Sequence, residues 1–193
     1  MFYSLEESAF TANLIALNRT TVSGFGKWLF KPGMAYGDRR KWWDNRTLRP
    51  KGHEGVDLAS YLDRSGRECR LGSGIVVPPL HPGRLAGTIA DFMGRTVIVR
   101  HEITNRRGLT LFGFYAHLLP AGDLETGKLL PATGGLGKIA PGNESCPGHL
   151  HISTAWLASG YPIEQFDWRR FEESKAFVPC NPVDFLPLAD HHL

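Results

Sequence analysis

Hydrophobic positions near the start of the chain recur with the period of a helix. Apolar side chains are spaced by three and four residues from Phe10 to Leu17, and Ser4 with Glu7 has capping-box spacing. The pattern predicts a helix over residues 4–17. Two glycines that follow, at positions 24 and 26, are expected to end this segment.

The pattern changes to that of strands between residues 51 and about 155. Four short runs rich in β-branched and aromatic residues are bounded by glycine or charged turns. The runs cover residues 87–90, 96–102, 109–117 and 150–156. The intervals between them are too short for crossover helices, so the sheet is expected to be antiparallel.

The C-terminal part adds little helix to this picture. Residues 161–171 are expected to form one short helix, and residues 181–186 a closing turn with a last hydrophobic anchor. The 22 glycines and 13 prolines favour turns and short strands over a helical bundle. We therefore expect a mainly β protein with one N-terminal helix and few short helices.

An irregular segment, which we call the arm (residues 31–52), lies between the helix and the strands. Its basic and aromatic side chains are Arg39, Arg40, Lys41, Trp42, Trp43, Arg46, Arg49 and Lys51. It is either a groove wall that stacks on a substrate or sugar, or a surface arm whose tryptophans pack on the core. The 193 residues suit one domain, or one domain with an added arm, and we divide the chain into an N-terminal helix and arm (1–50) and a β domain (51–193).

Composition limits the class of partner. With 42% hydrophobic and 21% charged residues, the chain is typical of a folded, globular protein. A formal charge of +3 is too small to indicate nucleic acid, although it would suit an anionic surface such as a bacterial wall. No run is long and apolar enough to cross a membrane. No signal peptide is visible, so both export by a signal outside this sequence and a cytoplasmic location stay open.

The three cysteines do not indicate a metal site. Cys69, Cys146 and Cys180 form no CxxC pair, which argues against a thiolate zinc site or a thioredoxin motif. Their odd number leaves open either one disulfide with a free thiol or three buried thiols.

The HxH segment formed by His149, Leu150 and His151 is the first candidate for chemistry. Side chains alternate across a strand, so the two imidazoles project from one face, about 7 Å apart at the backbone. Leu150 points the other way and is expected to face a core. One histidine can thus hold a metal while the other stays within reach of a bound substrate.

A second candidate is the pair His53 and Asp57. On a straight strand these residues would lie about 13 Å apart, too far to share one ion. Glycines on both sides of His53 and Glu54 disfavour a helix, so we expect a bend that Gly55 permits. Val56 and Leu58 are then expected to face the core, and Glu54 to make at most an indirect contact with the metal.

His117 ends an apolar strand, where a histidine is by itself more typical of a core or edge position. Together with the HxH segment and the pair His53 and Asp57, however, His117 becomes a candidate for catalysis. A zinc hydrolase needs three protein ligands, an open position, a proton acceptor and a group that stabilises the oxyanion. One aspartate and four histidines in three segments can fill these roles. The remaining histidines carry no such signal, and the charged neighbours of His101 suggest that it faces solvent.

The HxxxD, Tyr-Ala-His and HxH segments, in that order, resemble the lysostaphin/LytM-type zinc endopeptidases that cleave peptidoglycan cross-bridges. The resemblance covers roughly residues 50–187 and includes the closing segment 181–186. It departs from the family in the long segment 61–82 and in the turn 141–148 before HxH. The arm has no clear counterpart and could cover the groove as a pro-segment would.

The resemblance implies a twisted antiparallel, sandwich-like sheet with a groove. It implies that His53, Asp57 and His151 bind Zn²⁺ and that His117 and His149 are catalytic histidines. Either of these two would accept the proton of the attacking water while the other stabilises the oxyanion. The implied substrate is a peptidoglycan stem peptide or cross-bridge, and the implied location is periplasmic or extracellular.

Two alternatives to this enzyme agree less well with the sequence. A cell-wall-binding or hydrolase-activating module on the same scaffold would be expected to lack one of the ligands, and none is missing here. A D-Ala-D-Ala carboxypeptidase would need a wider His-to-Asp spacing and an ExxH segment, and neither is found.

Overall fold

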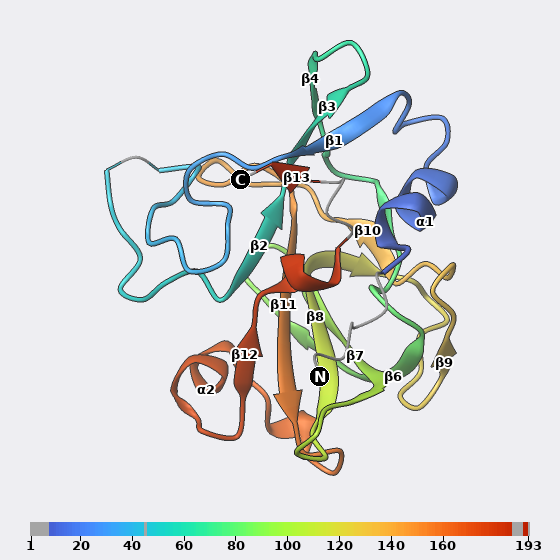
Figure 1. The fold of residues 1–193 in the computed structure, drawn as a ribbon, viewed down its shortest axis with the longest axis vertical. Coiled ribbons are helices and arrows are strands. Elements are labelled where there is room, and N and C mark those ends of the chain that lie inside the picture. Colours follow the sequence, from blue (N-terminus) through green and yellow to red (C-terminus); the bar gives the residue numbers. More distant parts are fainter. Residues whose placement is uncertain (1–7, 45, 187–190, 193) are drawn as a thin grey trace.

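The computed structural model describes residues 8–44, 46–186 and 191–192, and most of its regular structure is β (Figure 1). The helical elements are α1 (Phe10–Leu17), η1 (Ile163–Gln165), α2 (Trp168–Glu173) and η2 (Pro182–Phe185). The strands are β1 (Phe25–Leu29), β2 (Gly55–Leu58), β3 (Ser60–Asp63), β4 (Glu68–Arg70), β5 (Val76–Val77), β6 (Gly83–Ala90), β7 (Arg95–Thr104), β8 (Thr110–Pro120), β9 (Leu129–Leu130), β10 (Gly137–Ile139), β11 (Leu150–Leu157), β12 (Val178–Cys180) and β13 (His191–His192).

The larger sheet carries the order β12-β11-β8-β7-β6-β9, with β2 paired to β11 and β10 paired to β8 and β5. Every pairing in it is antiparallel, as predicted. A second sheet has the order β13-β1-β3-β4, and its β1–β13 pairing is parallel. The four predicted strands are confirmed and fall in β6, β7, β8 and β11.

Both faces of the large sheet are covered by apolar side chains. On β7, Val97 and Val99 belong to one hydrophobic cluster, and Ile98, which points the opposite way, belongs to another. The first cluster includes Phe10 of α1, and the second includes Phe171 of α2. The expected sandwich-like, mainly β architecture is therefore confirmed.

The N-terminal helix is shorter than predicted. It begins at Phe10 and ends at Leu17, and the proposed cap of Ser4 and Glu7 lies outside the described residues. The helix ends well before the glycines because the side chain of Asn18 forms hydrogen bonds with backbone groups at the C-terminal end of the helix and in a neighbouring strand. Its amide donates to the carbonyls of Leu14 and Val76, each at 2.8 Å, and its oxygen accepts from the Val76 N–H.

The expected single helix over residues 161–171 is wrong, because the segment forms two short helices, η1 and α2. Asp167 has extended backbone angles between them, and its carboxylate accepts from the Arg170 N–H at 2.7 Å, which caps α2. The closing segment behaves as predicted: Asn181 caps η2 by accepting from the Val183 N–H.

His101 was expected to face solvent, and this is wrong. It is 1% exposed, and its Nδ1–H donates to the Pro82 carbonyl at 3.3 Å while Nε2 lies 3.2 Å from the Tyr115 hydroxyl. Burial and the neighbouring His81 lower the pKa of His101 to about 4. Its charged sequence neighbours point the other way across the strand, so they say little about its own surroundings.

Two further findings concern the cysteines and the helices. All three cysteines carry free thiols. Among the described residues, no helix is long and apolar enough to cross a membrane.

Candidate metal centre

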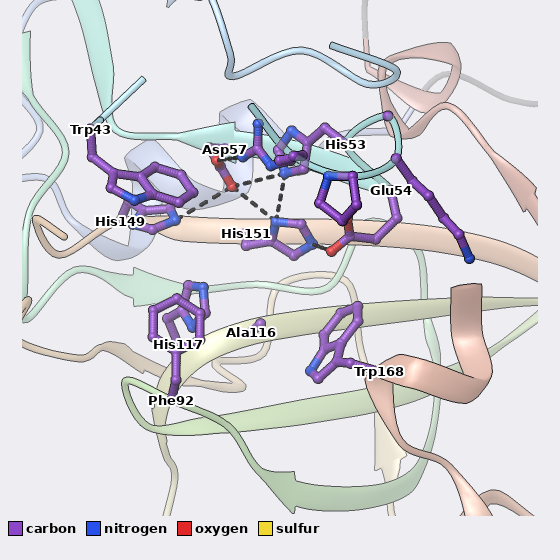
Figure 2. A pocket seen from close by; sticks show the side chains of 14 residues that line it. Trp43, His53, Glu54, Asp57, Phe92, Ala116, His117, His149, His151 and Trp168 are labelled. Atoms are coloured by element: carbon purple, nitrogen blue, oxygen red, sulfur yellow. Dashed lines mark hydrogen bonds and ion pairs between the residues drawn. The ribbon is translucent and has the colours of Figure 1, made fainter. Parts of the chain in front are cut away.

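Strand pairing brings the candidate residues together at one end of β11. The antiparallel register places Asp57 of β2 directly opposite His151 of β11. On the other side of β11, Ala116 of β8 is opposite His151, so His117 is one residue further along. Figure 2 shows Asp57 among three histidines, with His117 on the facing wall. All five predicted site residues line one cavity.

The chain bends at Glu54, between His53 and the first residue of β2, as the spacing required. Gly55 is needed there for a different reason from the one expected, because its φ is not positive. A Cβ at this position would lie 2.2 Å from the Ile152 carbonyl oxygen and 2.5 Å from Ser153 Oγ. Glycine therefore allows β2 to approach β11 closely. Val56 and Leu58 lie in the core, as predicted.

Three side chains offer a compact set of ligand atoms. His151 Nδ1 lies 2.9 Å from Asp57 Oδ1 and 3.1 Å from His53 Nε2, and His53 Nε2 lies 3.4 Å from Asp57 Oδ1. Atoms bound to one tetrahedral zinc at about 2.0–2.2 Å would lie about 3.3–3.6 Å apart. One of the three distances lies in this range and the other two are shorter by at most about 0.4 Å, and two imidazoles with one carboxylate are ligands that suit zinc. This is the only such group of three metal-binding side chains found in the described part of the chain.

Asp57 is ionised in this environment. Burial alone would raise its pKa, but His53, His149 and His151 hold the pKa of Asp57 well below its usual range. Its other oxygen, Oδ2, accepts a hydrogen bond from Trp42 Nε1–H at 2.8 Å.

His149 is held beside Asp57 without being part of the group of three. Its Nδ1–H donates to the Pro147 carbonyl at 2.8 Å, and its Nε2 lies 3.4 Å from Asp57 Oδ1. Burial would lower the pKa of His149, but the contacts with Asp57 and Cys146 raise it to about 10. The ring packs edge-on against Trp42 and is stacked with Trp43.

His117 is fixed by a carboxylate from the β6–β7 turn. Its Nδ1–H donates to Asp91 Oδ1 at 3.1 Å, and its backbone N–H donates to Asp91 Oδ2 at 2.9 Å. Burial lowers the pKa of His117 despite this carboxylate. The ring centroid lies 4.8 Å from that of His149 and 6.0 Å from that of His151.

The cavity above these residues has a volume of about 310 Å³. Its walls carry three aromatic side chains, Trp43, Phe92 and Trp168, of which Phe92 is 66% exposed. Phe92 packs against His117, and Trp168 packs edge-on against His151 (Figure 2). Such a site can bind an extended, partly apolar chain next to a metal.

Several residues of this site were missed by the sequence analysis. Asp91 gave no signal, because only the fold brings it to His117. The sequence places Trp42 and Arg49 in the arm but gives no sign that they are partners of Asp57. Glu54, for which at most an indirect contact was expected, has its Oε1 3.6 Å from His151 Nε2.

No family model matches the chain, and no match was found among curated proteins. Solved structures give low-identity matches. The chain resembles M23-type peptidases in structure. Against the catalytic domain of the prophage-encoded M23 protein EnpA from Enterococcus faecalis, identity is 15% and the TM-score 0.42, covering 70% of this chain and 88% of that one. Against the catalytic domain of lysostaphin from Staphylococcus simulans, identity is 19% and the TM-score 0.43, covering 66% and 80%.

A third match is the SpoIIQ–SpoIIIAH pore-forming complex, at 18% identity and a TM-score of 0.47, covering 88% of this chain and 87% of that one. Identities and TM-scores are low throughout.

Proposed function

We propose that this protein is a zinc-dependent metalloendopeptidase in which His53, Asp57 and His151 hold the metal and His117 and His149 act on the reacting groups. One observation carries the proposal: three buried ligand atoms within 3.4 Å of one another lie in an open cavity with two further histidines. Two imidazoles and one carboxylate with an open position are typical of catalytic rather than structural zinc.

A zinc ion bound there would lower the pKa of water to about 7 and polarise a peptide carbonyl. The protein's own groups must then move the proton. His117 suits this task, because Nδ1 is committed to Asp91 and Nε2 is left to accept a proton. The carboxylate of Asp91 stabilises the imidazolium that forms, and His117 can return the proton to the leaving amine.

His149 suits the other role. Its Nδ1–H donates to the neutral carbonyl of Pro147, so it lacks the supporting carboxylate that Asp91 gives to His117. The carboxylate near its Nε2 is that of Asp57, which we assign to the metal. We assign it to bind the substrate carbonyl and the oxyanion that develops there. This choice separates two roles that the sequence alone leaves interchangeable.

For the substrate we propose a peptide of the bacterial cell wall, either a stem peptide or a cross-bridge. The motif order of the sequence supports this choice, and the aromatic walls suit an extended peptide. A cell-wall substrate requires the protein to act in the periplasm or outside the cell.

The test is digestion of purified peptidoglycan by the metal-loaded protein, with and without a chelator, read by mass spectrometry of the released peptides. An unfolded protein substrate runs in parallel. We expect cell-wall peptides that vanish with the chelator and return with added zinc. Zinc binding without cleavage of either substrate would reject the peptidase, and the absence of bound zinc after loading would favour a binding module.

A further inference from the structure

We infer that the arm is part of the metal centre, and that Trp42 and Arg49 are positioning residues which fix the ligand carboxylate of Asp57. The inference rests on the metal site proposed above. It assigns a role to a segment that the resemblance to known peptidases leaves without a counterpart.

The two oxygens of Asp57 have separate partners. Oδ1 faces the histidines, at 2.9 Å from His151 Nδ1. Oδ2 faces the arm, where it accepts from Trp42 Nε1–H at 2.8 Å and lies 3.4 Å from Arg49 Nη2. Rotation of the carboxylate would break the contacts of both oxygens. The arm therefore determines which oxygen, and which lone pair, is presented to a metal.

Arg49 is itself held in place by other groups of the arm. Its guanidinium donates to the backbone carbonyls of Gly33, at 2.9 Å, and Arg40, and lies 5.0 Å from the ring centroid of Trp43. Its side chain is 12% exposed. An arginine held in this way loses little further entropy when it pairs with a carboxylate.

The fold of the arm depends on a glycine. Gly33 has φ +96°, and a Cβ there would lie 2.6 Å from the Trp42 backbone nitrogen. Its N–H donates to Asp38 Oδ2 at 2.9 Å. The arm thus folds back on itself, which brings Trp42 and Arg49 to the same carboxylate oxygen.

Backbone hydrogen bonds tie the arm to both ends of the ligand-bearing segment. The N–H of His53 donates to the Asp38 carbonyl at 3.0 Å, and the His53 carbonyl accepts from the Gly37 N–H at 2.8 Å. The N–H of Asp57 donates to the carbonyl of the buried Met34 at 2.9 Å. These bonds make the arm a support of the site, and they argue against a pro-segment that covers the groove and is then removed.

The test is the zinc affinity of the full chain, measured by competition with a chromophoric chelator. Trp42→Phe removes the N–H and keeps most of the ring, and Arg49→Met removes the charge. We expect each to weaken zinc binding by about 10–100-fold, the loss typical of outer partners of metal ligands. Arg49→Lys keeps the charge without the fork of donors and is expected to recover part of the affinity.

Matched controls come from the same chain. Arg46→Met changes an exposed arginine of the arm, and Trp156→Phe a tryptophan of β11 away from the cavity. Both should bind zinc as the parent does, and thermal unfolding of the metal-free proteins reports on folding. If Trp42→Phe fails to fold, the two Arg49 variants carry the test.

The outcomes separate the two proposals. If the parent chain binds no zinc, the proposed function fails and the inference fails with it. If the parent binds zinc and the folded Trp42 and Arg49 variants bind it within twofold of the parent, only the role of the arm is overturned.

Discussion

The carboxylate of Asp91 accepts two hydrogen bonds from His117, one from its imidazole and one from its backbone N–H. His117 is also the only non-glycine residue with positive φ, 64°, in the described part of the chain. The second hydrogen bond holds this uncommon backbone conformation, which turns the side chain toward the cavity. Asp91 thus fixes both the ring and the main chain that carries it.

Replacement of Asp91 by Asn should lower kcat about 100-fold while KM and the bound zinc change little, because the amide cannot stabilise an imidazolium. Asp91 raises the pKa of His117, so its loss should move the acid limb of the kcat/KM profile to lower pH. Steady-state kinetics between pH 4 and 9, about the range in which histidine titrates, would measure both effects.

Asp123→Asn, at an exposed carboxylate paired with Lys128, is the matched control for this change. An Asp91→Asn enzyme with the parental kcat would show that His117 does not depend on this carboxylate.

The assigned roles predict two classes of alanine variant. His53→Ala, Asp57→Ala and His151→Ala should lose both zinc and hydrolysis. His117→Ala and His149→Ala should keep zinc and lose at least about 100-fold in hydrolysis. Metal content by mass spectrometry and peptidoglycan digestion would separate the classes. A His149→Ala protein that digests at the parental rate would remove that residue from the mechanism.

Gly55→Ala should destabilise the fold by about 1–3 kcal/mol or more, because the new methyl group would meet the Ile152 carbonyl at 2.2 Å. Gly72→Ala is the control, since a Cβ there meets nothing within 4 Å and its φ is not positive. Urea unfolding of both metal-free variants gives the comparison. Equal urea midpoints for the two variants would mean that β2 can move away from β11 without loss of stability.

His101 predicts a loss of stability in mild acid. Its pKa is about 4 in the fold against 6.5 when exposed, so the unfolded chain binds more protons between these values. The free energy of unfolding should fall as the pH drops from 6.5 toward 4, by about 3 kcal/mol from this group. The chelator-treated His101→Gln variant should lose less stability over the same interval. If parent and variant lose the same amount, the burial of His101 does not govern the response.

The alternation of side chains made part of the site predictable. It placed His149 and His151 on one face and Leu150 in the core, and the structure has all three there. The spacing of His53 and Asp57 required a bend, which occurs at Glu54. These features follow from local geometry, so the sequence is sufficient to predict them.

The residues that were missed depend on long-range pairing. Asp91 reaches His117 only because β6, β7 and β8 are adjacent, and Trp42 reaches Asp57 only because the arm folds back across β2. The burial of His101 depends on the groups that pack over β7, and the residues next to it in the sequence do not indicate these groups. Contacts between residues so far apart in the sequence leave no periodic pattern in it, so they could not be predicted from it.

The register of β2 against β11 has one further consequence. In Gly55–Leu58 the side chains alternate between the metal centre and the core, so a single inserted or deleted residue would exchange the two sets. Asp57 would turn into an apolar interior, and Val56 would turn out of it. Changes of chain length in this segment would therefore abolish folding and metal binding in one step, and only substitutions can adjust the site gradually.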